Sequence, residues 1–263
     1  MSMSQQLAAD LPFLRRYARA LTGSQERGDE MVRAALEAVL ADDELKRSLG
    51  EGRVALYRAF HQTMEDPSDG AIAGAAAAQG GSTGTKEAAA ASRLEAIAPR
   101  NRQALLLTTV EDFTPDQAAK IMGIEAGEVE RLVAEAVREI DEEQSTSVLI
   151  IEDEPMILMQ LEDLVSSLGH DICGTATTRT EAVRTVTENR PGLILADIQL
   201  ADGSSGLDAV ADILALGSVP VIFITAYPER LLTGDRAEPT YLVTKPFREQ
   251  TVKASISQAL FFK

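Results

Sequence analysis

The sequence predicts a multidomain chain: an all-helical N-terminal half, followed by a doubly wound α/β domain with a five-stranded parallel sheet. Before about residue 144, apolar residues recur at helical spacing and β-branched runs are absent. After residue 146, five short β-rich runs alternate with amphipathic segments, which is typical of a parallel sheet covered by helices on both faces. A length of 263 residues is enough for two domains, each with its own core.

The helical half is divided by a stretch of small residues. This stretch is rich in Gly and Ala and has little to bury, so it predicts a flexible connector. The expected parts of the chain are a helical unit at 1–66, the connector at 67–92, a second helical unit at 93–143 and the α/β domain at 147–263.

The second helical unit has the outline of a helix-turn-helix motif at about 116–140. An Asp-Phe-Thr-Pro turn precedes a helix that begins at Pro115, and a turn centred on Gly123 leads into the next helix. That helix would present four acidic residues to DNA phosphates against two arginines: Glu128, Glu130, Glu135 and Glu139 against Arg131 and Arg138. Like charge opposes DNA binding by this helix. A DNA-binding regulator therefore stays the alternative to a protein-binding one.

In the α/β half, polar residues follow the strands where the strands end. Glu152 and Asp153 lie just past the first strand, Asp197 lies at the end of the third, and Thr225 and Lys245 end the fourth and the fifth. Because ligands of such folds bind beyond the carboxyl ends of the strands, these side chains are expected to converge. Converging carboxylates need a cation, and oxygen ligands favour a hard ion such as Mg²⁺.

The same residues suit phosphoryl chemistry. Asp197 can act as the nucleophile that accepts a phosphoryl group, while Lys245 and the hydroxyl of Thr225 bind that group. Glu154 follows the acidic pair and is expected to face solvent or to cap the helix that begins at Pro155.

These motifs resemble those of response-regulator receiver domains. Glu152-Asp153, Asp197, Thr225 and Lys245-Pro246 match the receiver pattern in identity and order. The resemblance implies that Gln199 supplies a backbone carbonyl to the metal and that a sensor histidine kinase or phosphotransfer protein is a partner. It also implies phosphoryl acceptance with intrinsic dephosphorylation and no enzyme activity on an outside substrate. The segment 223–227 resembles a receiver subgroup in which Tyr227 would be the aromatic residue that reports phosphorylation.

The helical half resembles regions 2 and 4 of extracytoplasmic-function sigma factors. A sigma-like half that precedes a receiver is similar to the PhyR-type response regulators of the general stress response. This resemblance implies an anti-anti-sigma factor: phosphorylation of Asp197 would free the sigma-like half to sequester an anti-sigma factor of the NepR type, which releases the true sigma factor.

Composition narrows the partners. A formal net charge of −16 opposes binding to nucleic acid or to an anionic membrane surface, so protein partners are expected. No run of about 18 apolar residues is free of Gly, Pro or charge, and the first residues carry no export signal. A cytoplasmic location follows as an expectation.

Overall fold

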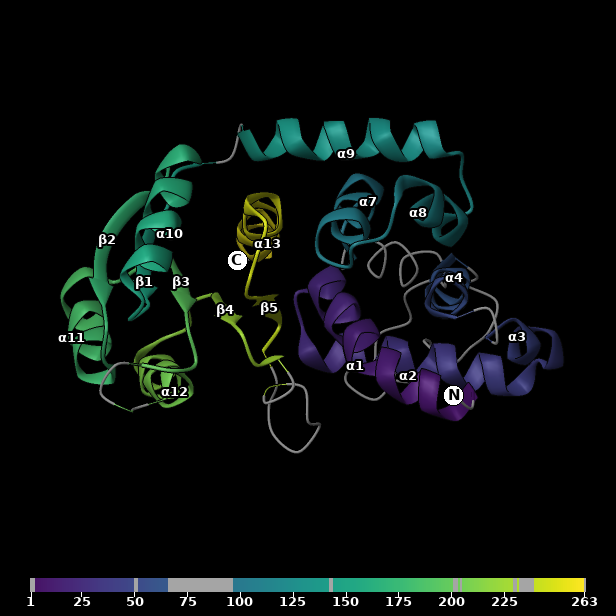
Figure 1. Ribbon diagram of the computed structural model, residues 1–263, viewed down its shortest axis with the longest axis horizontal. Helices are drawn as coiled ribbons and strands as arrows, with labels where there is room; N and C mark the ends of the chain where they lie inside the picture. Colours follow the sequence, from purple (N-terminus) through teal and green to yellow (C-terminus); the bar gives the residue numbers. More distant parts are fainter. Residues whose placement is uncertain are drawn as a thin grey trace, which may run out of the picture. The chain divides into compact units, whose positions relative to one another are not determined.

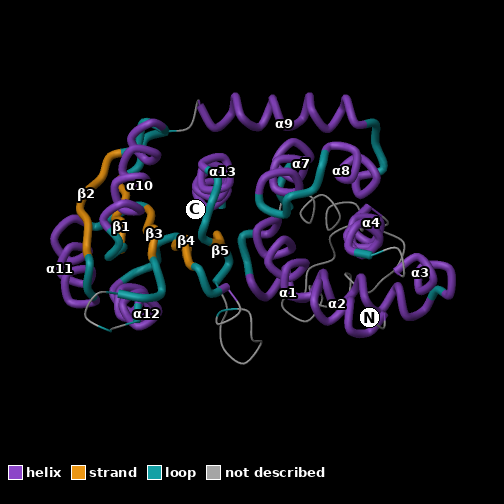
Figure 2. Tube along the Cα trace, viewed as in Figure 1, coloured by secondary structure: helices purple, strands orange, loops and turns teal. Residues whose placement is uncertain are grey.

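The computed structural model describes residues 3–49, 52–65, 97–141, 144–200, 203, 205–228, 231 and 239–262. They divide into two compact units, Met1–Ala136 and Val137–Lys263. The strands lie in the second unit, and the first is built from helices (Figures 1 and 2). The expected order of a helical half and an α/β half is confirmed. The connector expected at 67–92 lies outside the described residues.

The first unit is held together by packing among its N-terminal helices and the helices that follow residue 97. Its elements are α1 (Met3–Thr22), α2 (Gln25–Ala41), α3 (Asp43–Ser48), α4 (Arg53–Glu65), α7 (Arg100–Thr109), α8 (Pro115–Met122) and the N-terminal part of α9 (Ala126–Asp141). Helix α2 packs on α1 and α4, and α4 also packs on α8. Gly28 permits the close approach of α2 to α1, since a Cβ there would lie 2.6 Å from the backbone nitrogen of Arg19.

Local sequence signals set the turns of the predicted helix-turn-helix. Thr114 and Gln117 form a capping box at the start of α8, where Pro115 is the first helical residue. Gly123 ends the helix at φ +66, a left-handed conformation that favours glycine. The helix that follows this turn, α9, begins at Ala126.

A buried charge network joins α1 and α4 to the turn after α7. Glu111 is 1% exposed. It accepts hydrogen bonds from Arg16 Nε (3.0 Å) and Nη2 (2.9 Å), from Tyr57 Oη (2.7 Å) and from Arg53 Nη2. The guanidinium of Arg53 also lies 4.6 Å from the centre of the Phe113 ring. This network ties helices of the two predicted helical units to each other through one carboxylate.

The second unit is a five-stranded parallel sheet with strand order β2-β1-β3-β4-β5. Its strands are β1 (Ser147–Ile151), β2 (Asp171–Ala176), β3 (Leu193–Ala196), β4 (Val221–Thr225) and β5 (Tyr241–Thr244). Its helices are α10 (Pro155–Ser167), α11 (Arg179–Asn189), α12 (Gly206–Leu216) and α13 (Glu249–Phe261). The predicted doubly wound fold is confirmed.

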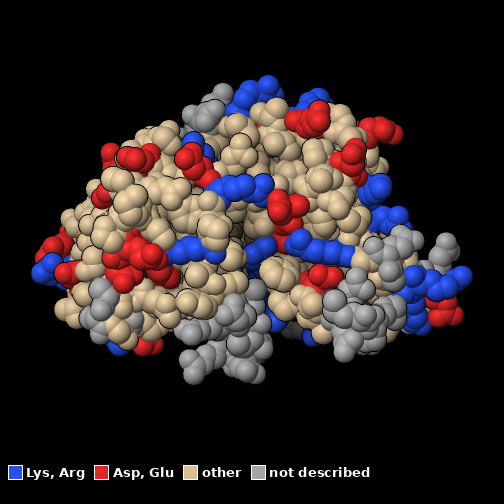
Figure 3. All heavy atoms as spheres, viewed as in Figure 1, with Lys and Arg blue, Asp and Glu red and all other residues tan. Residues whose placement is uncertain are grey.

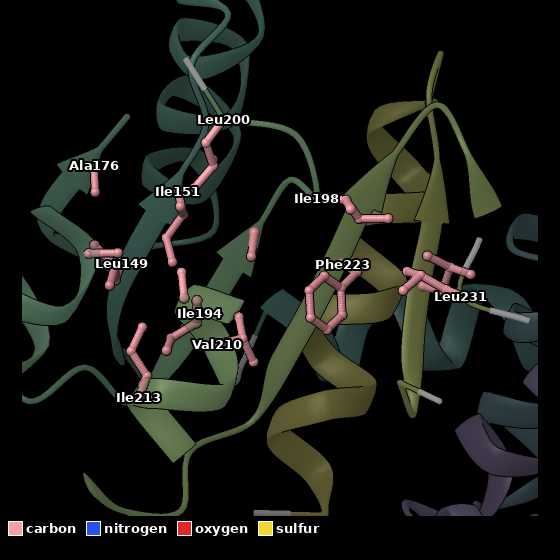
Figure 4. Close-up of a cluster of buried hydrophobic side chains, with 14 residues drawn as sticks. Leu149, Ile151, Ala176, Ile194, Ile198, Leu200, Val210, Ile213, Phe223 and Leu231 are labelled. Atoms are coloured by element: carbon pink, nitrogen blue, oxygen red, sulfur yellow. The ribbon is translucent and has the colours of Figure 1, made fainter. Parts of the chain in front are cut away.

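The central strands are apolar throughout because both faces of the sheet are covered. Helices α10 and α13 cover one face, and α11 and α12 the other (Figure 1). Strand residues such as Leu149, Ile194 and Phe223 belong to one buried cluster with Val210 and Ile213 of α12 (Figure 4). This packing fixes the ends of the strands, and with them the polar residues that follow.

No helix among the described residues combines the length and the apolar character needed to cross a membrane.

Candidate metal and phosphoryl site

Backbone hydrogen bonds align the carboxyl ends of the strands that carry the polar residues. The amide of Glu152 donates to Ala176 O (2.9 Å), and that of Asp197 to Ile151 O (2.8 Å). The amide of Lys245 donates to Thr225 O (2.7 Å). The ladder therefore places these residues at one edge of the sheet, although they are distant in sequence.

Three carboxylates meet at this edge. Glu152, Asp153 and Asp197 each offer an oxygen, and these three oxygens lie within 4.8 Å of one another. Glu152 is fully buried, Asp197 is 7% exposed and Asp153 is half-buried. The structure thus brings together the acidic residues that the sequence predicts as metal ligands.

Lys245 inserts its amino group among these carboxylates. Its Nζ lies 2.7 Å from Asp197 Oδ2, and 3.0 and 2.8 Å from the two oxygens of Glu152. Burial alone would lower the pKa of Lys245, but the bonds and charges of Asp197 and Glu152 outweigh burial and raise it. Burial raises the pKa of Glu152 to about 6, although Lys245 pulls it down. One ammonium therefore does not neutralise the cluster.

The donor set fits a hard divalent cation. All three acidic residues offer oxygen, as Mg²⁺ requires. Glu152 Oε2 is buried and accepts no well-directed hydrogen bond from any described residue, despite its proximity to Lys245. A buried carboxylate oxygen without a directed donor is costly unless a cation neutralises it.

Asp197 is positioned by its own turn and by the start of α12. Its Oδ1 accepts a hydrogen bond from Ile198 N at 2.5 Å and a longer one from Gln199 N at 3.4 Å. Gly206 packs against the backbone of Asp197 so closely that a Cβ would lie 1.7 Å from the Asp197 carbonyl oxygen. The carboxylate is therefore held by the amides of its own turn, and the backbone of Asp197 is packed against the start of α12. The predicted metal contact from the Gln199 carbonyl stays a prediction.

Thr225 is the last residue of β4, and Tyr227 follows it at the same edge. Thr225 is fully buried, and its Oγ1 accepts a hydrogen bond from Tyr227 N at 3.1 Å. The Tyr227 side chain is 40% exposed. Its role as a reporter of phosphorylation stays a prediction, as does phosphoryl binding by Thr225.

Glu154 is a member of the site that the sequence reasoning did not identify. It is exposed, as expected, but at the start of α10 its side chain makes no capping hydrogen bond. Its Oε1 instead lies 3.3 Å from Lys245 Nζ. The lysine lies more than ninety residues away in sequence, so only the fold reveals this contact.

The exposed face of α9 carries charges that pair with each other. Arg131 lies 3.6 Å from Glu128 and 3.7 Å from Glu135, at helical spacings of three and four residues. This arginine, which would be available for phosphate contact in a DNA-binding helix, therefore lies between two acidic residues.

Three family models match successive parts of the chain. The sigma2 domain of PhyR matches residues 7–61. The sigma-like domain of the response regulator PhyR matches 94–143, and the response regulator receiver domain matches 148–257.

Several relatives match the chain over almost its whole length. The phyllosphere-induced regulator PhyR of Methylorubrum extorquens is 49% identical over 265 residues, which cover 100% of this chain and 96% of the relative. The crystal structure of the response regulator PhyR from Brucella abortus is 47% identical, with a TM-score of 0.82 and coverage of 100% of this chain and 95% of that one. The anti-anti-sigma factor PhyR from Bartonella quintana is 46% identical, with a TM-score of 0.84 and coverage of 99% and 96%.

Proposed function

This chain belongs to the PhyR family of response regulators, and we propose that it is a phosphorylation-activated anti-anti-sigma factor. The observation that carries the proposal is the cluster of Glu152, Asp153, Asp197 and Lys245 in a chain whose helical half matches the sigma-like domains. The Bartonella quintana relative, similar over almost the whole length, is an anti-anti-sigma factor.

In the proposed reaction, a carboxylate oxygen of Asp197 forms a bond to the phosphorus of a donor phosphohistidine or acyl phosphate. The bond between phosphorus and the donor breaks, and the donor leaves with that electron pair. Mg²⁺, held by Glu152, Asp153, Asp197 and the Gln199 carbonyl, would neutralise charge on the phosphoryl oxygens. Lys245 and the Thr225 hydroxyl then bind the transferred group. A sensor histidine kinase or a phosphotransfer protein supplies the donor, and the chain acts on no outside substrate.

The transferred phosphoryl group carries a charge of about −1.5 to −2 and replaces the single negative charge of the Asp197 carboxylate, so negative charge and acceptor oxygens increase at the sheet edge. This change frees the sigma-like half to sequester an anti-sigma factor of the NepR type, which releases the true sigma factor. The working parts are the sigma-like units at 1–66 and 93–143, the connector at 67–92 and the receiver at 147–263. The matched ranges of the family models fall within these parts. The partners are cytoplasmic proteins, and we place the chain with them.

The alternative is a DNA-binding regulator that uses the helix-turn-helix of α8 and α9. The capping box and the Gly123 turn favour that outline. The acidic face of α9 and the ion pairs of Arg131 oppose it, because DNA phosphates would meet like charge. On the face shown in Figure 3, acidic side chains lie among the basic ones in both units.

Binding measurements with the full chain test the proposal. Acetyl phosphate and Mg²⁺ should convert the protein to a form that binds a fluorescent anti-sigma factor of the NepR type, with a Kd at least tenfold lower than before treatment. Asp197→Asn should abolish this conversion, and a matched Asp163→Asn change on the exposed face of α10 should leave it intact. If the protein treated with acetyl phosphate does not bind the anti-sigma factor but binds promoter DNA with an affinity that falls as salt increases, the DNA-binding alternative is supported.

A further inference from the structure

Glu154 lies at the N-cap position of α10, yet its side chain does not cap the helix. Its Oε1 contacts Lys245 Nζ at 3.3 Å instead. The Glu154 side chain is 60% exposed, whereas that of Lys245 is 7% exposed. Glu154 therefore reaches the lysine from the solvent side of the site.

The amino group of Lys245 meets three carboxylates and has three protons to donate. Two of the partners, Glu152 and Asp197, also belong to the group that could hold a metal ion. Glu154 does not belong to that group. The turn that carries it is nevertheless fixed to the site, because the amide of Glu154 donates to Glu152 Oε1 at 3.3 Å.

A divalent cation and Lys245 would compete for the carboxylates of Glu152 and Asp197. The two charges of the cation would repel the nearby ammonium group and weaken its shortest contacts. The contact between Lys245 Nζ and Glu154 is the longest of the three contacts of this amino group. It is also the one that the cation leaves in place.

We propose that Glu154 is a positioning residue for Lys245, a role that rests on the proposed phosphoryl transfer to Asp197. It holds the amino group at the mouth of the site while the metal occupies the inner carboxylates. Lys245 is then beside the phosphoryl group when that group arrives.

The spectroscopic test uses full-length protein labelled at the lysine side chains, in which the Lys245 resonance is assigned from a Lys245→Met sample. In the wild type, Mg²⁺ should leave the Lys245 amino group in an environment distinct from that of exposed lysines such as Lys120. In Glu154→Gln with Mg²⁺, this signal should move to the position of the exposed lysines. An unchanged Lys245 signal in Glu154→Gln would overturn the proposal.

The kinetic test measures phosphorylation by acetyl phosphate at saturating Mg²⁺. Glu154→Gln should slow it by about two- to fivefold, the size expected for a partly exposed ion pair. Glu154→Asp, which keeps the charge, should restore part of the rate. Asp163→Asn removes the same charge from the exposed face of α10 and should have no effect beyond error.

A double-mutant cycle separates positioning from a general field effect. The slowing caused by Glu154→Gln should vanish in a Lys245→Met background, because the lysine that Glu154 positions is then absent. Equal slowing in both backgrounds, or equal slowing by Asp163→Asn, would contradict the inference. If wild-type protein accepts no phosphoryl group, the proposed function fails, and the labelled-lysine experiment still reports on the contact between Glu154 and Lys245.

Discussion

Each unit of the molecule buries a cluster of charges, and the two clusters have opposite balances. In the helical unit, one carboxylate, that of Glu111, meets the guanidinium groups of Arg16 and Arg53. In the receiver, one ammonium, that of Lys245, meets Glu152 and Asp197, with further carboxylates beside them. The cluster in the helical unit has an excess of positive charge, and the cluster in the receiver has an excess of negative charge.

The difference shows what each cluster can do. Every oxygen of Glu111 has donors, so its geometry is closed and fixes how the helices meet. The receiver cluster keeps a buried carboxylate oxygen without a directed donor and has more carboxylates than ammonium groups, so it favours the uptake of a further cation. Arg53 Nε in the first cluster is also buried without a hydrogen-bond partner among the described residues, so the two clusters differ in charge balance and not in complete hydrogen bonding. A carboxylate neutralised by two arginines is structural, whereas a cluster with excess negative charge is suited to binding and to reaction.

The largest effect is expected from Glu111→Ala. Two arginines would remain near the core without their carboxylate, and the free energy of unfolding of the helical unit should fall by about 3–5 kcal/mol. Urea denaturation measures this loss, and native-state hydrogen exchange of the α1 and α4 amides shows whether the loss lies in the helical unit. Glu130→Ala, on the exposed face of α9, should cost less than about 0.5 kcal/mol. If a joint replacement of Arg16, Glu111 and Arg53 by Met, Leu and Met destabilises more than Glu111→Ala, the network is a source of stability and not a geometric lock.

The second effect concerns the receiver. Lys245→Met removes the ammonium from the carboxylates and should destabilise the metal-free receiver by about 2–3 kcal/mol. Mg²⁺ should then raise the melting temperature of Lys245→Met more than that of the wild type, because the competing ammonium is absent. Calorimetric melting with and without Mg²⁺ measures both values. An equal Mg²⁺ effect on the two proteins would show that lysine and metal do not share oxygens.

A third effect is pH-dependent and lies in the helical unit. Burial, with help from Arg100, lowers the pKa of His61 from 6.5 to about 3. Between pH 6.5 and 3, His61 is therefore protonated in the unfolded chain but neutral in the folded unit. The contribution of His61 to the free energy of unfolding is complete above about pH 6.5 and decreases as the pH falls toward 3. At pH 5 the loss from this group is about 2 kcal/mol. His61→Gln should flatten this part of the pH profile of urea unfolding, and a profile as steep as that of the wild type would contradict the assignment.

The smallest effect should come from Arg53→Lys. The charge is kept, but a lysine cannot reproduce the two-pronged contact with Glu111 or stack in the same way on Phe113. We expect a loss of about 1 kcal/mol in urea unfolding. Arg33→Lys, at an exposed position of α2, is the matched control and should change stability little.

Much of the fold could be predicted because it depends on local patterns. The β-branched run before Glu152 is apolar on both faces, which indicates a covered central strand. Gly123 and the Thr114–Gln117 capping box are local signals that set the turn between α8 and α9. Parallel strands bring their carboxyl ends to one edge, so the meeting of Asp197 with Glu152 and Lys245 could be expected before any coordinates.

The buried partners of charged residues could not be predicted in the same way. Glu111 stands beside Asp112 in a turn, and by sequence alone it resembles an ordinary solvated acid. The same holds for Arg16, Arg53 and Glu154. A charged side chain gives the same local signal whether it faces water or a partner brought near by folding.

The sequence by itself determined the order of the parts, the strands, the turns and the residue types at the reactive edge, because these follow from periodicity and short-range backbone preferences. Only the tertiary structure decided which charges are neutralised: Glu111 by two arginines, and Lys245 by carboxylates that include Glu154. Ion pairing depends on distances of a few ångströms between residues far apart in the chain, and those distances exist only after the helices and strands have packed.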